Sequence, residues 1–171
     1  MSLNIVQCLN QIATYCRIQG AKISIDANSV PTCVYKNKTT VGALNIALML
    51  IEASKTNLSA QNSVELAQIY EWFEYTLLYC TASNSQVVIK DLNDHLSLKT
   101  FLVNDRLTIA DIILYYAVYN IVENMTYLEK EKFVHFSRWF DNMQQDKKLL
   151  QKNKSIDFST NYLVSVAPAR H

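Results

Sequence analysis

Residues 107–112 open a stretch that is apolar on almost every side, and this stretch restricts the folds available to the chain. Thr108 has the chemistry of a helix N-cap, and Asp111 stands three residues later, where its carboxylate can reach back to the N–H of Thr108 in a capping box. The predicted helix, 109–122, carries only Asp111 and Asn120 as strongly polar side chains. Because it is shorter than the roughly 20 residues that span a bilayer, we predict that it is the buried axis of a helical domain, with Thr108 and Asp111 as a buried cap.

Length and composition fit a packed, mainly helical protein. The chain has 171 residues, of which 50% are hydrophobic and 18% are charged, so it can bury a substantial core and is not expected to be disordered. Its two glycines and two prolines are too few for a turn-rich all-β architecture. The sequence therefore predicts an α+β protein that is mostly helical.

Charge and cysteine content argue against several kinds of partner and cofactor. A net charge of +1 attracts nucleic acid weakly, so we expect no direct nucleic-acid binding. The densest basic patch is interpreted as a solvated helix end and consists of Lys147, Lys148, Lys152 and Lys154. The cysteines follow no metal-ligand spacing, so we expect buried reduced thiols, no metal and no cofactor. We expect no signal peptide and no membrane segment. The predicted location is therefore a reducing compartment, either the cytosol or the nucleus.

Residues 1–56 are predicted to form a small α/β unit. Apolar side chains at helical spacing predict a helix over 3–17 that ends at Gly20. Two strands are expected over 22–27 and 32–35, with Pro31 between them and a tight turn at 36–38. A helix capped by Thr40 is expected over 40–53. The polar stretch 54–62 is interpreted as a linker, which divides the chain into domains 1–56 and 57–171.

The stretch 41–51 is almost wholly apolar and cannot bury all its sides against one small sheet. Part of its surface is therefore predicted to meet either a partner chain or the neighbouring domain, and the sequence leaves these alternatives open. The surface assigned to a partner consists of Val41, Leu44, Asn45 and Leu48.

Residues 57–171 are predicted to be all helical. A long first helix has a core face marked by apolar spacing at Leu66, Ile69, Tyr70, Phe73, Leu77 and Cys80. A second helix is marked by Val88, Leu92 and Leu96. A single helix is expected over 128–143, followed by a short segment at 147–151 and an apolar tail at 162–166.

A small α/β unit with Val30-Pro31 before a strand, followed by a helical unit with Leu-Thr-x-Ala-Asp at the start of a buried helix, resembles the glutathione-transferase fold. The resemblance implies a truncated thioredoxin-like unit over 1–56 and an all-α C-terminal domain over 57–171. Segments 90–93, 107–116, 129–132 and 137–140 are, more narrowly, similar to the elongation factor one epsilon family. Members of that family are accessory scaffolds of the multi-aminoacyl-tRNA synthetase complex.

The family resemblance implies a non-enzymatic adaptor with two docking surfaces. One surface pairs with the transferase-like domain of methionyl-tRNA synthetase, and the second docks that of glutamyl-prolyl-tRNA synthetase. The second surface uses the arginine of a Ser-Arg-Trp-Phe segment, which is Arg138 here, although an ordinary surface arginine is the alternative interpretation. The resemblance also implies a cytoplasmic location and a nuclear role in the DNA-damage response. Whether the chain forms a homodimer without a partner stays open.

The catalytic features of glutathione transferases are incomplete in this sequence. Such enzymes need a first strand and loop with a Tyr, Ser or Cys for the thiolate, a cis-proline, and an acidic or Gln residue followed by Ser at a helix start. Here a helix is expected first, a cis peptide bond is suspected before Pro31, and Thr39 and Thr40 replace the last pair. We therefore expect no catalysis, and we interpret His95 and His135 as core or boundary residues. A degenerate glutathione-binding protein or transferase is the alternative, and a nucleic-acid module is the weakest one.

Overall fold

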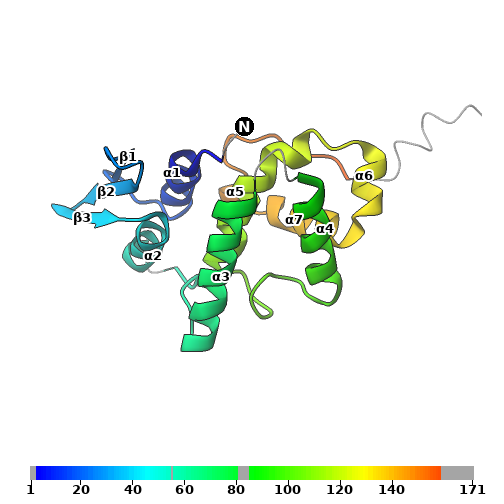
Figure 1. Ribbon diagram of the computed structural model, residues 1–171, viewed down its shortest axis with the longest axis horizontal. Helices are drawn as coiled ribbons and strands as arrows, with labels where there is room; N and C mark the ends of the chain where they lie inside the picture. Colours follow the sequence, from blue (N-terminus) through cyan, green and yellow to red (C-terminus); the bar gives the residue numbers. More distant parts are fainter. Residues whose placement is uncertain (1–2, 55, 81–84, 159–171) are drawn as a thin grey trace, which may run out of the picture.

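Helix α5 (Ile109–Glu123) runs through the centre of the molecule, and the other helices gather around it (Figure 1). The computed structural model describes residues 3–54, 56–80 and 85–158. Every residue of α5 from Ile109 to Tyr119 is buried, which confirms the predicted helical axis. The helices that pack against it include α1 (Ile5–Tyr15), α2 (Ala43–Ser54) and α3 (Ser63–Tyr79). The order of elements is that of a mostly helical α+β fold, as predicted.

The N-terminal part contains a three-stranded antiparallel sheet in the order β1-β2-β3, at the left of Figure 1. The strands are β1 (Lys22–Ile25), β2 (Pro31–Tyr35) and β3 (Lys38–Val41). Lys36 and Asn37 connect the last two strands with positive φ values of 48° and 61°, the geometry that suits a two-residue hairpin. Cys33, in the middle of the sheet, is fully buried.

Two sequence-based expectations for this unit are wrong. Thr40 lies in β3 opposite Cys33 rather than at a helix N-cap, because residues 38–41 continue the hairpin and α2 begins only at Ala43. Gly42, with φ of 94°, makes the bend between strand and helix. The peptide bond before Pro31 is trans, since the chain has no cis bond among its described residues. A trans bond keeps Pro31 extended in register with Ile25, and its carbonyl accepts the N–H of Gly42 at 2.8 Å.

The C-terminal part is helical throughout its described residues. α4 (Ser85–His95) leads into a 3₁₀ turn, η2 (Leu96–Leu98). The single helix expected over 128–143 is instead two helices, α6 (Tyr127–Lys132) and α7 (Val134–Gln144). Phe133, with φ −105° and ψ 56°, breaks the helix because its buried ring turns the chain inward. α8 (Lys147–Leu150) follows as predicted, whereas the apolar tail at 162–166 lies outside the described residues.

Both parts contribute to one hydrophobic core. α1 and α2 from the first part touch α5 from the second, so the core is continuous across the predicted linker. The boundary between 1–56 and 57–171 stays a prediction. In the described part of the chain, no helix is both long and apolar enough to cross a bilayer.

The cap of α5 is the buried polar centre of the helical part. Asp111 is fully buried, and its carboxylate accepts four hydrogen bonds. The N–H and the hydroxyl of Thr108 each donate at 3.0 Å, which forms the predicted capping box. Leu102 N–H donates at 2.9 Å from the preceding loop, and the indole of Trp139 donates at 3.2 Å from α7. Burial raises the pKa of Asp111, but the four donors match its acceptor sites and join three segments at one carboxylate.

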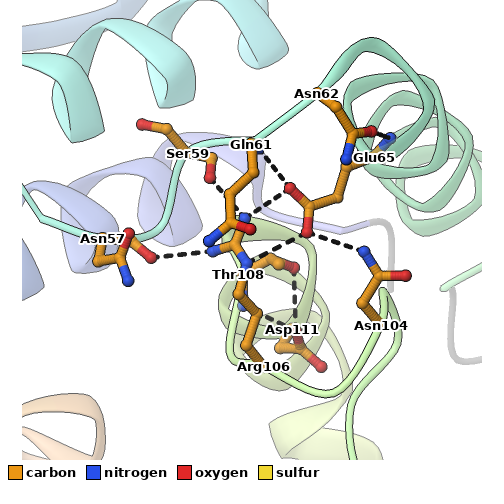
Figure 2. A network of polar contacts seen from close by, with 9 residues as sticks. All are labelled: Asn57, Ser59, Gln61, Asn62, Glu65, Asn104, Arg106, Thr108 and Asp111. Carbon is orange, nitrogen blue, oxygen red and sulfur yellow. Dashed lines mark hydrogen bonds and ion pairs between the residues drawn. The ribbon is translucent and has the colours of Figure 1, made fainter.

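A second buried carboxylate, Glu65, lies in the first turn of α3 (Figure 2). Arg106 forms an ion pair with it, donating to its two oxygens at 2.7 Å and 3.1 Å. Asn104 donates at 2.9 Å, and the N–H of Gln61 also donates to this carboxylate. The Arg106 hydrogen bonds are the main reason that the pKa of Glu65 falls to about 2.

The same arginine holds the predicted linker. Its guanidinium donates to the carbonyls of Asn57 at 3.0 Å and Ser59 at 2.6 Å (Figure 2). Arg106 precedes the cap of α5 by two residues, so one side chain ties the linker, the start of α3 and the start of α5 together. We call these contacts of Arg106 with Glu65, Asn57 and Ser59 the clamp. The clamp fixes the position at which the first part of the chain joins the helical part.

Replacing Asp111 by alanine should destabilise the protein by about 3 kcal/mol, because buried donors on Leu102 and Trp139 lose their acceptor. The measurement is urea unfolding at neutral pH. The matched control is Thr126→Ala in the exposed capping box of α6, which should cost about 1 kcal/mol. Equal losses in the two variants would contradict a special role for the buried cap.

Protonation of Glu65 should loosen the clamp in acid. Its folded pKa of about 2 lies below the ordinary value of 4.5, so its stabilising effect is complete above pH 4.5 and is lost as the pH falls toward 2. As the pH falls across that range, the free energy of unfolding should decrease less steeply for Glu65→Gln than for the wild type. Glu71→Gln, which changes an exposed carboxylate of the same helix, should keep the wild-type decline. Superimposable curves for all three proteins would refute the assignment.

Candidate interaction surfaces

The first predicted surface lies on α2 and the end of β3. α2 buries one side against α1 and the sheet through Ala43, Ile46, Ala47, Leu50 and Ile51. Leu44 and Leu48, four residues apart, are half-buried on its flank, and Asn45 is exposed. α2 also touches α5, so the second part of the chain covers some of the helix but leaves this flank partly open. The neighbouring part of the chain therefore covers some of α2, and whether a partner covers the open flank stays a prediction.

Val41 belongs to a different element from the other three residues. It ends β3, on the sheet face opposite to buried Cys33, and half of it is exposed. Its carbonyl accepts the side-chain amide of Asn45 at 2.9 Å, which keeps the strand end beside the first turn of α2. The structure therefore brings the four predicted residues into one neighbourhood, although through a strand and a helix rather than one helix face.

The second predicted surface is centred on Arg138 in α7. The large side chains around it, Phe136, Trp139 and Phe140, are buried, while Arg138 itself is exposed. Its Nη2 donates to the carbonyls of Leu96 at 2.8 Å and Lys99 at 2.9 Å. This arginine therefore closes the end of η2, and only part of its guanidinium is used in doing so.

Apolar side chains that the sequence did not single out surround Arg138. Leu98, inside the turn that Arg138 holds, is 96% exposed. Val134, one helical turn before Arg138, is 56% exposed. An arginine beside exposed apolar side chains is the composition typical of a protein–protein contact. The sequence feature that could have indicated this surface is Leu98, an apolar residue between the polar residues Ser97 and Lys99.

α3 contributes further exposed apolar area that sequence periodicity assigned wrongly. Tyr70 and Leu77, expected in the core, are 39% and 37% exposed. The buried positions include two polar residues instead, Glu65 and Thr76. Glu65 is satisfied by Arg106, and the Thr76 hydroxyl donates to the carbonyl of Trp72 at 2.8 Å, so both can be buried without unpaired polar atoms.

The structure gives no support for a thiolate nucleophile. All four cysteines are free and buried, and burial raises the pKa of Cys8 and Cys80 to about 12. A thiol that stays protonated at neutral pH is a weak nucleophile. His95 is half-buried, with Nε2 3.1 Å from the carbonyl of Leu102 and its ring against Trp72, and burial lowers its pKa. It is a boundary residue, as predicted. Among the residues that the structure describes, no cluster of side chains has the make-up of a metal site.

The chain is similar in sequence to known proteins. Residues 65–147 match the family model described as nuclear-export cofactor Arc1p. The chain is 34% identical to mouse eukaryotic translation elongation factor 1 epsilon-1 over 128 residues, which cover 72% of this chain and 74% of that protein. It is 30% identical over 113 residues to the Chinese hamster bifunctional glutamate/proline–tRNA ligase, covering 64% of this chain and 7% of the ligase.

A glutathione S-transferase of class Gtt2 from Vibrio parahaemolyticus shares the fold. Its TM-score is 0.66 at 16% sequence identity, covering 93% of this chain and 98% of the transferase. At that identity the likeness concerns the fold alone. The extent and identity of the match to the mouse protein, together with the shared fold, show that this chain belongs to the eukaryotic translation elongation factor 1 epsilon-1 family.

Proposed function

We propose that the protein is a non-catalytic scaffold for aminoacyl-tRNA synthetases, acting as an adaptor within a multi-synthetase complex. The observation that carries the proposal is the partly open apolar flank of α2, with Leu44 and Leu48 half-buried and Val41 half exposed. Leu44 and Leu48 pack against the core with part of their surface and leave the rest open, where a partner can cover it. Membership of the elongation factor 1 epsilon-1 family and the likeness to a tRNA-aminoacylation cofactor from fission yeast support a role beside synthetases.

The flank of α2 and the end of β3 form the proposed docking surface for the transferase-like domain of methionyl-tRNA synthetase. A stable interface buries on the order of 1,600 Å² in total, more than Val41, Leu44, Asn45 and Leu48 alone provide. Neighbouring exposed side chains on other elements must therefore contribute.

Arg138, with Leu98 and Val134, forms the proposed second surface, which docks the transferase-like domain of glutamyl-prolyl-tRNA synthetase. A bifunctional glutamate/proline–tRNA ligase shares a segment of this fold with the chain, so the two proteins offer related surfaces. The planar guanidinium suits bidentate pairing with a carboxylate, and η2 holds it in place before the partner arrives. Two separate surfaces let one copy bridge two synthetases.

The proposed role is binding rather than catalysis. Burial keeps the Cys8 thiol of the first part protonated, and Thr40 lies in β3 instead of at a helix start, so neither of these two described residues supplies an activated nucleophile. We place the protein in the cytoplasm, where synthetases act. A nuclear pool belongs to the same proposal and depends on the family relationship alone.

Charge introduced at the first surface should break the methionyl-tRNA synthetase complex. We expect Val41→Asp to weaken binding at least about tenfold, because an unpaired carboxylate would be buried in the interface. The measurement is co-expression with the N-terminal domain of methionyl-tRNA synthetase, size-exclusion chromatography and calorimetry of the purified partners. Co-elution of the wild-type pair as a heterodimer is the required baseline.

The matched control is Val87→Asp. Val87 is an exposed valine, 63% against 50% for Val41, on α4, which lies away from β3 and α2 (Figure 1). It should bind as the wild type does. Separate elution of the wild-type proteins at micromolar concentration, or equal loss in both variants, would overturn the assignment of this surface. A homodimer of the chain alone would show as a shift in its own elution volume.

Removing the arginine at the second surface should weaken the complex with the glutamyl-prolyl-tRNA synthetase domain. We expect a rise in the dissociation constant of about tenfold or more for Arg138→Ala, with the fold retained. Because Arg138 also holds η2, a second variant tests the surface without touching that contact. Leu98→Ser changes a side chain that is 96% exposed and should weaken binding without lowering the melting temperature.

Binding to the methionyl-tRNA synthetase domain supplies the internal control for both variants. It should be unchanged, since α7 and η2 lie away from α2 and β3 (Figure 1). An unchanged dissociation constant for the glutamyl-prolyl domain in both variants would remove Arg138 from the interface. Loss of both partners together would indicate unfolding instead of a docking defect.

A further inference from the structure

A polar groove runs along the outward side of α1, on elements that the two proposed docking surfaces do not use. It has a volume of about 900 Å³. One wall is the solvent side of α1, which presents carboxamide and hydroxyl side chains at helical spacing. These are Asn4, Gln7, Asn10, Gln11 and Thr14. In the described part of the chain, no hydrogen bond engages the side chains of Gln7, Asn10 or Gln11, so these amides face the groove with their donors and acceptors unused.

The other wall is basic. It consists of α8 and the turn after it and carries Lys147, Lys148 and Lys152, while Arg17 adds a fourth cation from the end of α1. All four are exposed, and no aspartate or glutamate lines the groove. Asp146, beside this wall, is already engaged, since its carboxylate accepts the hydroxyl of Tyr15 at 3.2 Å and the N–H of Lys148 at 2.9 Å. A quarter of the 16 basic residues of a nearly neutral chain therefore meet here.

The two walls are tied to each other. Gln151, at the end of α8, donates to the carbonyl of Gln11 at 2.7 Å and to the hydroxyl of Tyr116 at 2.9 Å. Tyr15 bonds Asp146 from the other wall. In Figure 1 the orange segment that contains this wall runs beside α1. These contacts fix the two walls relative to each other. Binding of a ligand between them therefore requires little loss of main-chain conformational entropy.

One atom in the groove lacks a partner. The side-chain amide nitrogen of Asn153 is buried, and within the residues that the structure describes it donates to no acceptor. Because this nitrogen is closed to solvent, a ligand oxygen reaches it only if the side chain turns toward the groove. The unpaired donor costs free energy as it stands, so such a turn toward an acceptor would be favourable.

We propose that this groove binds an extended acidic polypeptide segment. A peptide bond offers one N–H donor and one carbonyl acceptor, and a carboxamide side chain offers the same pair, so the row of amides on α1 suits a peptide main chain. The lysines and Arg17 then pair with acidic side chains that project from that main chain. Charge complementarity identifies the partner, because four cations line the groove and outweigh the carboxylate of Asp146 beside it.

Nucleic acid fits the same groove less well. A sugar–phosphate backbone presents mainly acceptors, which would leave the amide oxygens of α1 unpaired. The net charge of +1 provides no wide positive field outside the groove. The aromatic ring nearest to it, Tyr15, is half-buried and hydrogen-bonded, so it does not offer a stacking platform for bases.

The experiment uses the full chain and a fluorescein-labelled peptide of about twelve residues in which glutamate and aspartate alternate with serine. We expect saturable binding by fluorescence anisotropy that weakens as salt is raised. A peptide with glutamine and asparagine in place of the acidic residues should not bind. A labelled RNA hairpin of comparable charge is measured in parallel.

The groove variant reverses two charges, Lys148→Glu with Lys152→Glu, and should lower the affinity for the acidic peptide at least about tenfold. The matched control reverses two exposed lysines of the sheet, Lys22→Glu with Lys38→Glu, and should change it less than about twofold. All four positions are exposed, so melting temperatures should stay close to that of the wild type.

Three outcomes would overturn the proposal. The first is absence of peptide binding at low salt, and the second is equal weakening in the two variants. The third is tighter binding of the RNA hairpin that the groove variant abolishes, which would assign the groove to nucleic acid. Since the groove and the synthetase surfaces use different residues, each assignment can fail while the other holds.

Discussion

The carboxylate of Asp111, buried at the start of α5, is the contact on which the helical part depends. Four donors from α5, from the loop before it and from α7 converge on one side chain. The first amides of a helix have no partners within the helix, and in a core no water can supply them. The cap therefore lets a helix that is buried along its length begin inside the protein. It also sets the position of α7, and with it the position of Arg138.

A second buried carboxylate performs the corresponding task for the connection between the two parts. Glu65 and Arg106 bring the segment around residue 60 against the start of α5 (Figure 2). An isolated ion pair at a surface contributes little, but this one is buried and joined by hydrogen bonds from Asn104 and from the main chain. The relative placement of α2 and α7, and so of the two proposed docking surfaces, follows from these polar contacts as well as from the shared core.

The outer surface carries its exposed apolar side chains in separate groups. Apart from the core around α5, they include residues of β3, α3, η2 and α7, while Leu44 and Leu48 of α2 are half-buried. The groove along α1 is different in kind, since amides and cations line it. One small chain therefore presents apolar and basic surfaces in separate places, which suits the proposed adaptor role.

The sequence by itself determined the local features that rest on short-range chemistry. The cap at Thr108 and Asp111, the buried axis, the hairpin turn at Lys36 and Asn37, and the short α8 all follow from neighbouring residues. The predicted residues Val41, Leu44, Asn45, Leu48 and Arg138 are all at least partly exposed, though whether partners bind them stays a prediction. Tertiary structure decided the rest. Periodicity predicted that Tyr70 and Leu77 lie in the core, and it did not identify Glu65 as a buried residue. No sequence pattern shows that Glu65 will meet Arg106 from 41 positions away and become buried. Likewise, the net charge counted along the sequence is close to zero. Only the fold shows that Arg17 lies in the same groove as Lys148 and Lys152. Distances along the chain do not report such contacts, because they depend on how separate helices pack.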